Sequence, residues 1–401
     1  MFREFVRVFS YDIFAKAIAG CSLFLIIRIL SPSQYADYSF FWSMSFLSAG
    51  FFAASLNKTI VVGYEDLQLA DRKGMLLVAQ LMIVGLSSAL ILVLNSASAE
   101  FVLGGVTFAL GVAGLDFSKA LYQRSLNFKA FPLVEVFKNS VILVGLLLLL
   151  YKGIDGQRVL LLQGGLGAIA AVVVLTRIRP NFDGFRWRET FRLYKSICRS
   201  DYVYLYLYLG IIAVFIQTDV FMLRKLSTDL QLATYSSSYR YYALAVMALE
   251  SVNNVQLPML MSAESKGQVQ AIFRSHKKMV MAYVPVCLAG AILSPFWIPL
   301  IDQGKYPDAP IVFGILSVSA IFSFGWSPLI NVLFSEKRFK AICLFAIFGW
   351  LINVGLNRVL VPQLGAPGAA IATFSGFLFI NGSVFWTAMK VLKGRMDRLA
   401  P

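Results

Sequence analysis

Among the ionisable side chains that lie inside long apolar stretches of this sequence, five are the strongest candidates for chemistry. Three are cations: Lys16, Lys58 and Arg240. Two are carboxylates: Asp219 and Glu250. A charged group in an apolar environment costs free energy unless it is paired or serves a function, so each of these residues requires an explanation. The cations are suited to holding an anionic group, and the carboxylates to exchanging a proton or a sodium ion.

The three cations differ in their local surroundings. Arg240 lies well inside its apolar stretch, is flanked by tyrosines and has no acidic residue three or four positions away, which favours a role in a cavity. Lys16 follows Asp12 by four residues, so an intrahelical pair and a cavity role both stay open. Lys58 lies near one end of its stretch, where its long side chain could instead reach the lipid headgroups.

The two carboxylates lack an obvious local counter-ion. Neither Asp219 nor Glu250 has a cation three or four positions away, so either could take up a proton or a cation. For Asp219 the alternative is a structural pair with Arg224 or with a neighbouring helix. Two other acid–base pairs are spaced three residues apart and are expected to neutralise each other: Asp116 with Lys119, and Glu135 with Lys138.

The elements that must position these residues are membrane helices. The chain of 401 residues is 58% hydrophobic and only 14% charged, with a mean hydropathy of +0.72, whereas soluble proteins are about a quarter charged. Its apolar residues form long runs, each able to cross a bilayer core of about 30 Å. We predict twelve spans, near residues 8–30, 37–61, 74–95, 100–122, 131–151, 157–176, 201–223, 233–258, 278–300, 308–333, 340–361 and 367–389.

The net charge of +15 is distributed unevenly between the loops on the two sides of this pattern. The side that holds both termini carries most of the lysines and arginines, including seven in the loop 177–199. The opposite loops carry only Lys152, Arg158, Arg224, Lys225, Lys305 and Arg358. By the positive-inside rule, both termini lie in the cytoplasm. The basic residues therefore indicate topology and contact with anionic lipids, and not nucleic-acid binding.

The sequence shows no catalytic or metal-binding arrangement. The only histidine, His276, is expected in a basic cytoplasmic loop, and the four cysteines have neither metal nor redox spacing. No glycine-rich loop followed by Lys and Ser or Thr indicates direct use of ATP. The N-terminal stretch MFREFVRVFSYDIFAK is interrupted by charges and is not expected to be a cleaved signal peptide. We therefore expect no enzyme, no metal and no cofactor.

A polar corner occurs twice along the chain. RILSPSQYADYS at 28–39 is similar to RKLSTDLQLATYS at 224–236, and each copy follows an odd-numbered predicted span, the first and the seventh. A weaker pair is GGLGAIAA at 164–171 and GAPGAAIAT at 365–373. Two halves of six helices with the same orientation form a parallel repeat. We predict an all-α membrane protein with an N-terminal lobe, 1–195, and a C-terminal lobe, 196–401.

Three stretches resemble one family of membrane transporters. They are RILSPSQYADYSFFWS, QTDVFMLRKLSTDLQLATYSSSYRYYAL (217–244) and LGAPGAAIATFSGFLF (364–379). They resemble polysaccharide flippases for O-antigen and exopolysaccharide, in the multidrug/oligosaccharidyl-lipid/polysaccharide exporter superfamily. The resemblance implies two helix bundles around a central cavity and alternating access. It also implies that an undecaprenyl-pyrophosphate-linked oligosaccharide moves to the outer leaflet of the bacterial inner membrane.

The same resemblance assigns roles to the intramembrane charges. Such flippases have cationic residues in helices one, two and eight, where Lys16, Lys58 and Arg240 lie here. Lysine replaces the commoner arginine at the first two positions, which keeps the charge but loses bidentate geometry. The energy for transport would come from a proton or sodium gradient, and Asp219 or Glu250 would exchange the proton or the sodium ion. We further expect a monomer in contact with membrane lipids, with a polysaccharide polymerase as a candidate partner.

Two other functions stay open at this point. A multidrug or cation exporter of the same superfamily would share the fold, but we would expect its cavity to be more acidic. A polysaccharide polymerase or ligase is also polytopic, but would usually carry a large outer loop with arginine and histidine. The outer loops predicted here are short, which favours the flippase over a polymerase or ligase.

The predicted topology can be checked by labelling. In a variant without the four native cysteines, Ser33→Cys and Asp229→Cys should react with a membrane-impermeant maleimide in intact cells, because both corners face outside. Ser196→Cys, in the loop 177–199, should react only after lysis. Labelling of position 33 or 229 only after lysis would contradict this topology.

Overall fold

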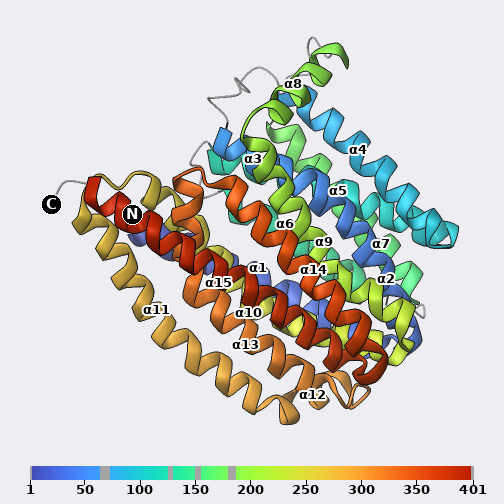
Figure 1. The fold of residues 1–401 in the computed structure, drawn as a ribbon. Coiled ribbons are helices and arrows are strands. Elements are labelled where there is room, and N and C mark those ends of the chain that lie inside the picture. Colours follow the sequence, from blue (N-terminus) through green and yellow to red (C-terminus); the bar gives the residue numbers. More distant parts are fainter. Residues whose placement is uncertain (1, 64–72, 125–129, 150–154, 179–186, 399–401) are drawn as a thin grey trace. The chain divides into compact units, whose positions relative to one another are not determined.

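The chain folds into helices joined by short connections (Figure 1). The computed structural model describes residues 2–63, 73–124, 130–149, 155–178 and 187–398. No β-strand occurs in these ranges. The predicted all-α class is therefore confirmed, as expected for a chain whose backbone polar groups must be satisfied without water. The chain divides into two compact units, residues 1–217 and 218–401.

Unit 1 contains the first nine helical segments and the beginning of the next. These are α1 (Phe2–Ile29), α2 (Pro32–Ser48), the π-helix η1 (Ala49–Ala54), α3 (Ser55–Gly63), α4 (Lys73–Leu94), α5 (Ala99–Arg124), α6 (Ala130–Leu149), α7 (Gly156–Ile178), α8 (Trp187–Arg199) and the first part of α9 (Tyr202–Leu226). α2, η1 and α3 follow one another without a break and correspond to the second predicted span.

Unit 2 contains the end of α9 and six further helices. These are α10 (Asp229–Met261), α11 (Lys266–Ile292), α12 (Ser294–Asp302), α13 (Ala309–Ser335), α14 (Phe339–Leu364) and α15 (Ala366–Arg398). α11 and α12 bend by 65° at their junction and correspond to the ninth predicted span. Each of the twelve predicted spans thus matches one helix or one such group.

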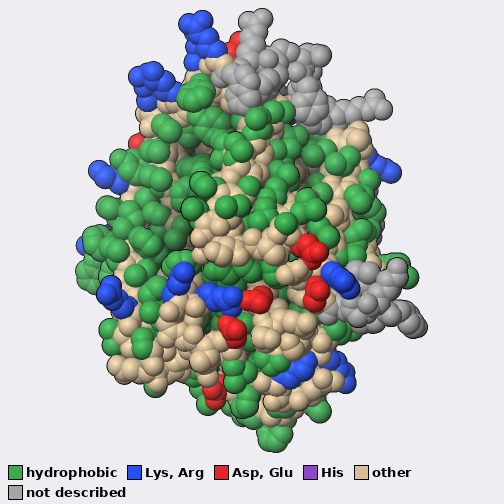
Figure 2. Space-filling model, turned by 90° about the vertical axis from the view of Figure 1, so that its right-hand side faces the viewer, with side chains coloured by type: hydrophobic (Ala, Val, Ile, Leu, Met, Phe, Trp, Pro, Cys, Tyr) green, Lys and Arg blue, Asp and Glu red, His purple; other side chains and the backbone are tan. Residues whose placement is uncertain are grey.

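The composition of the helices identifies a multi-pass membrane protein. Within the described ranges, eight helices are long and apolar enough to cross a bilayer, and the bent pair of α11 and α12 makes a ninth. The side chains that these helices expose are largely hydrophobic, among them Leu86, Leu94 and Phe296, each at least 70% exposed. Figure 2 shows such side chains covering most of one face. An apolar surface of this extent is stable against lipid but not against water.

One segment of the predicted loop 177–199 is helical. Residues 187–199 form α8, whose Ile197 is buried against Leu56, Leu77 and other apolar side chains of unit 1. The loop prediction was wrong for these residues. Their many charges suggested a loop, although the few apolar residues among them are spaced as on one side of a short helix. α8 is too short to span a bilayer, and it connects two helices that are long enough to do so.

The repeated corner makes the same local structure twice. Ser31 caps α2 by accepting a hydrogen bond from the backbone N–H of Gln34, and Thr228 caps α10 in the same way through Gln231. Four positions after each of these glutamines lies a tyrosine that is fully buried, Tyr38 or Tyr235. The corner therefore fixes both the start of a helix and the place of a buried hydroxyl.

The division between the units falls inside α9, at Gln217/Thr218. The first part of α9 packs closely on η1: a Cβ at Gly210 would lie 2.9 Å from the Phe51 ring, and one at Gly50 would lie 3.0 Å from the Ala213 Cβ. This contact places α9 up to Gln217 with unit 1. The boundary at 195/196 between the two six-helix lobes stays a prediction.

Small residues allow α5 and α7 to pack at close range. A Cβ at Gly164 would lie 2.4 Å from the carbonyl oxygen of Gly104, and one at Gly111 would lie 2.8 Å from the backbone nitrogen of Ala168. Both contacts are with backbone, which a side-chain rotation cannot relieve. Gly164 of the GGLG stretch and Gly111 of α5 are thus required for close helix packing, as small residues are in other membrane bundles.

The contact at Gly164 predicts a local effect of one added methyl group. Gly164→Ala should lower the melting temperature of the purified protein, because overpacking typically costs about 1–3 kcal/mol. Gly165→Ala is the matched control, since nothing lies within 4 Å of its added Cβ. Equal melting temperatures for the two variants, measured by fluorescence-detected gel filtration after heating, would contradict this account of the packing.

Candidate functional site

A buried carboxylate forms the centre of a polar cluster in unit 2. Asp219, on α9, has no exposed surface. The Nδ2 atoms of Asn353 and Asn357, on α14, lie 2.9 and 2.7 Å from its Oδ1. The hydroxyls of Tyr235, on α10, and Thr373, on α15, donate to its Oδ2. Four helices therefore meet at one side chain.

The partners of Asp219 are all uncharged. The pairing of Asp219 with Arg224 that the sequence left open does not occur, because the Arg224 guanidinium lies 2.7 Å from the carboxylate of Asp229 instead. The other alternative was a partner on a neighbouring helix, and the partners that Asp219 has on neighbouring helices are all neutral. Among the described residues no cation contacts Asp219. An ionised carboxylate buried without a counter-ion is costly, so the cluster is suited to a bound proton or a bound cation.

The oxygen atoms around Asp219 favour a cation. The side-chain oxygens of Asn353 and Asn357 are buried and have no hydrogen-bond partner. The Asn357 Nδ2 also donates to the backbone carbonyl of Asn353 at 3.0 Å, which holds that amide as it is. If the Asn353 amide turned over, its oxygen would join those of Asp219, Tyr235 and Thr373. Oxygen donors are the ligands that hard cations prefer, and a single carboxylate balances a single positive charge. The arrangement could therefore hold a monovalent cation such as sodium.

The sequence contained a signal for this cluster that our reading missed. Asn353 and Asn357 are four residues apart in an otherwise apolar helix, so they lie on one face of α14. Both are fully buried, as is Thr373. A pair of asparagines at helical spacing inside a span therefore indicates a buried polar contact, as an intramembrane charge does. No group of three or more His, Cys, Asp or Glu side chains that could hold a metal occurs among the described residues.

The second predicted carboxylate is not placed by the structure. Glu250 lies on α10, but its side chain is outside the described residues. Its role in ion exchange stays a prediction.

The predicted cations are divided between the two units. Lys16, on α1, and Lys58, on α3, belong to unit 1, and Arg240, on α10, belongs to unit 2. All three are partly exposed. Asp12, the candidate partner of Lys16, has its side chain outside the described residues. The grouping of these cations in one cavity stays a prediction.

Lys58 stands out among these cations. Within the described parts of the chain its ammonium group has no hydrogen-bond or ion-pair partner, although it is only partly exposed. Its neighbour Asn57 is buried, and neither polar atom of that side chain is hydrogen-bonded. The two residues follow the π-helix η1, a feature that is frequent at functional sites. Unit 1 therefore presents an unpaired cation inside a membrane span.

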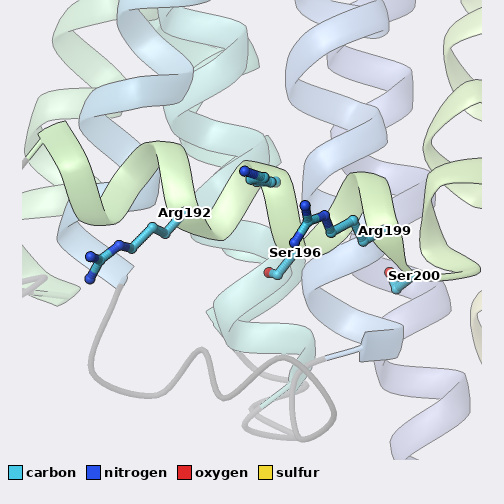
Figure 3. A pocket seen from close by; sticks show the side chains of 5 residues that line it. Arg192, Ser196, Arg199 and Ser200 are labelled. Carbon is cyan, nitrogen blue, oxygen red and sulfur yellow. The ribbon is translucent and has the colours of Figure 1, made fainter.

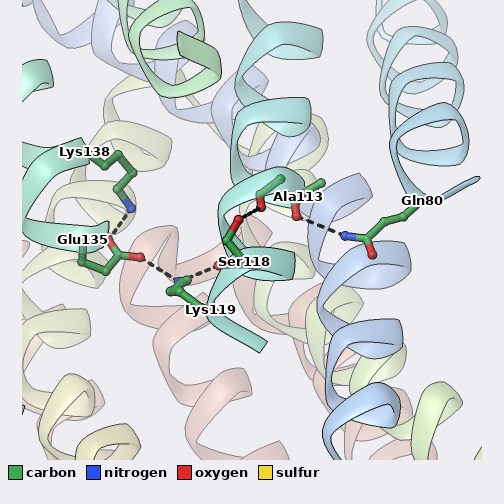
Figure 4. A network of polar contacts seen from close by, with 8 residues as sticks. Gln80, Ala113, Ser118, Lys119, Glu135 and Lys138 are labelled. Atoms are coloured by element: carbon green, nitrogen blue, oxygen red, sulfur yellow. Dashed lines mark hydrogen bonds and ion pairs between the residues drawn. The ribbon is translucent and has the colours of Figure 1, made fainter. Parts of the chain in front are cut away.

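The acid–base pairs on α5 and α6 are confirmed and are joined to each other. Lys119 lies 2.5 Å from Asp116 and 2.7 Å from Glu135, and Lys138 lies 2.5 Å from Glu135 (Figure 4). Two positive and two negative charges are thus balanced in one network. This network links α5 to α6 and leaves no net charge for a ligand.

The expectation for His276 was wrong. It lies on α11 and is 4% exposed, because the basic stretch around it continues the helix. Its Nε2 lies 2.9 Å from the carbonyl oxygen of Phe324, and its Nδ1 lies 3.0 Å from Nε2 of Gln256. A neutral imidazole that donates from Nε2 and accepts at Nδ1 satisfies both contacts.

Comparison with known proteins identifies the fold. No protein-family model and no curated protein sequence matches the chain. Among solved structures, the lipid II flippase MurJ in its inward closed conformation matches with a TM-score of 0.71 and 12% identity, over 96% of this chain and 87% of that one. An inward-facing multidrug resistance MATE family transporter matches with a TM-score of 0.65 and 14% identity, over 95% of each chain.

A further MATE structure, in the straight conformation, matches with a TM-score of 0.63 and 14% identity, over 97% of this chain and 96% of that one. The chain therefore shares the fold of these flippase and MATE transporter structures. At this level of identity the likeness establishes the fold alone.

The cluster around Asp219 predicts that sodium stabilises the protein. A ligand that binds only the folded state at one hundred times its dissociation constant adds about 2.7 kcal/mol of stability. The melting temperature should be higher in sodium chloride than in choline chloride, and Asp219→Asn should remove the difference. Asp229→Asn, which changes an exposed carboxylate, is the control. If sodium raised the melting temperature of wild type and of Asp219→Asn equally, the ion would bind at a site other than Asp219.

Proposed function

We propose that this protein is a flippase that moves an undecaprenyl-pyrophosphate-linked oligosaccharide from the cytoplasmic to the outer leaflet of the bacterial inner membrane. It would work by alternating access coupled to an ion gradient. The observation that carries the proposal is Lys58, an intramembrane cation with no partner among the described residues. The shared fold with a lipid II flippase supports it. An unpaired cation inside a span is costly unless an anionic group is supplied, and a transported pyrophosphate would supply one.

The charge of the cargo determines what the cavity must contain. A pyrophosphate that crosses hydrocarbon unaided faces a barrier of many kcal/mol, because it loses its hydration. In our proposal Arg240, Lys16 and Lys58 replace that hydration. The planar guanidinium of Arg240 can bind two phosphate oxygens at once, whereas a lysine provides a point charge. Beside Arg240, the ring of Tyr239 stacks on that of Tyr235, with 5.9 Å between the ring centroids.

The energy for transport would come from ion exchange at Asp219. Its carboxylate is buried and contacts only neutral groups, so binding and release of a sodium ion or a proton would change the charge of the cluster by one unit. The four helices that meet there would respond to that change. Glu250 is the second candidate for this role.

The setting of the proposed flippase follows from its charges. With most basic residues on the side of the termini, both termini would lie in the cytoplasm. The protein would work as a monomer among membrane lipids, with a polysaccharide polymerase as a candidate partner that receives the exported oligosaccharide. Neither nucleic acid nor a catalytic step is part of this proposal.

A multidrug or cation exporter is the second candidate. The MATE transporters match over the same length of chain, and Asp219 is a buried acid of the kind that can hold a cation. The unpaired Lys58 argues against a cationic cargo, because it would repel one. In proteoliposomes, uptake of a lipid-linked sugar without uptake of a fluorescent dye cation would favour the flippase, and the reverse result would favour the exporter.

The cargo hypothesis predicts a graded effect at Arg240. A charge-assisted hydrogen bond is worth about 1.5–3 kcal/mol, so Arg240→Ala should slow export roughly ten-fold or more, with lipid-linked precursor accumulating in the cytoplasmic leaflet. Arg240→Lys should keep part of the activity. The control variant is Arg158→Ala, which changes an exposed arginine and should leave export unchanged. Normal surface glycan with a stably expressed Arg240→Ala protein would show that the cargo's charge is recognised elsewhere.

A further inference from the structure

α8 presents cations on one face and apolar groups on the other. Arg192, Lys195 and Arg199 are separated by three and four residues, so they form one stripe along the helix. All three are exposed. On the opposite side Thr190 and Ile197 are buried, and Ile197 packs into the apolar core of unit 1. The orientation of the helix is therefore fixed by packing, and its basic stripe faces outward.

The stripe lines a pocket of about 460 Å³. Ser196 and Ser200 complete its lining, and Figure 3 shows the Arg199 guanidinium directed along the helix toward Ser196. Within the described part of the chain, none of the three cations has a hydrogen-bond or ion-pair partner. Three unpaired positive charges around one open pocket favour a ligand with negative charge on oxygen atoms.

The place of α8 indicates where that ligand comes from. α8 connects α7 to α9, and both of these helices can cross a bilayer, so α8 lies close to a membrane surface. Its Ile197 packs against α3 and the first turns of α4. Phe191 is 77% exposed and lies directly beside Arg192. A large exposed apolar ring next to basic residues is typical of helices that lie in the lipid headgroup region.

We propose that this pocket binds the headgroup phosphate of an anionic phospholipid of the surrounding leaflet. Arg192 and Arg199 would donate paired hydrogen bonds to the phosphate oxygens, Lys195 would add a third charge, and Phe191 would enter the acyl region. None of the residues that line the pocket is one of the proposed cargo residues, and this proposal does not depend on the proposed flippase activity. A bound lipid would fix α8, and with it the connection between the two repeats, to the membrane surface.

The test is a titration of the purified full-length protein with a short-chain phosphatidylglycerol. An environment-sensitive fluorophore on the exposed Cys198 reports binding, in a Cys21→Ser background, because Cys287 and Cys343 are buried. One basic residue near an anionic surface contributes about five-fold in affinity. The triple variant Arg192→Gln/Lys195→Gln/Arg199→Gln should therefore bind at least about ten-fold more weakly.

Three comparisons make the result specific. The control variant Arg274→Gln/Lys277→Gln/Lys278→Gln removes three exposed cations of α11 and should bind as wild type does. Arg192→Lys/Arg199→Lys keeps the charge and should retain most of the affinity. Short-chain phosphatidylcholine has the same phosphate without net charge and should bind weakly.

Equal affinity for phosphatidylglycerol and phosphatidylcholine would overturn the proposal, as would an unchanged affinity in the triple variant. Tight binding of inorganic pyrophosphate without binding of phosphatidylglycerol would also overturn it, because the pocket would then recognise the headgroup of a lipid pyrophosphate.

Discussion

The carboxylate of Asp219 imposes a condition on the whole second unit. Asp219 lies on α9, and α10, α14 and α15 each place side chains against it, all of them neutral. In the absence of water, a buried negative charge needs a proton or a cation to be stable. In the proposed mechanism, the packing of these four helices would therefore depend on one bound ion. Ion-coupled transport would need such a link, because only an ion that binds two conformations unequally can shift the population between them.

Comparison of the two repeats shows how the cluster around Asp219 differs from its counterpart. In unit 1 the hydroxyl of Tyr38 donates to Gln163 of α7, at 2.8 Å. In unit 2 the hydroxyl of Tyr235 lies beside Thr373 of α15 and donates to Asp219. The residue 196 positions before Asp219 is Leu23. Both repeats thus connect their second helix to their sixth through a buried tyrosine, but only unit 2 contains a carboxylate at that point.

Hydrophobic periodicity and charge spacing predicted most of the architecture. Each predicted span coincides with a helix or a group of helices, and the pairs Asp116–Lys119 and Glu135–Lys138 follow from charges spaced three residues apart, which meet on a helix. The contact of Lys119 with Glu135 that joins the two pairs was not predicted, because it depends on packing of α5 against α6. The repeated corner indicated only a repeat along the chain, and the structure shows that each copy also contains a helix cap and a buried tyrosine.

Other features depend on contacts that no local pattern encodes. Asn353, Asn357 and Thr373 are distant in sequence from Asp219, and only packing of α14 and α15 brings them together. His276 lies among basic residues yet is buried, because α11 continues through them and turns one side toward α10 and α13. The helix α8 was not predicted, because its sequence is rich in cations and only a narrow side of it is apolar. Polar residues with tertiary partners are thus the least predictable.

The geometry of α10 connects the two halves of the proposed mechanism. This helix carries Tyr235, which contacts the ion cluster, and Arg240, which would hold the cargo, five residues further on. The ring of Tyr239 stacks on Tyr235 on one side and lies 5.3 Å from the ring of Tyr242 on the other, so the aromatic groups form a continuous row along this turn. A shift of Tyr235 when the ion leaves would be passed to the backbone that carries Arg240. Because coupling between two binding sites is reciprocal, cargo held by Arg240 would change the affinity of the Asp219 cluster for its ion by the same factor.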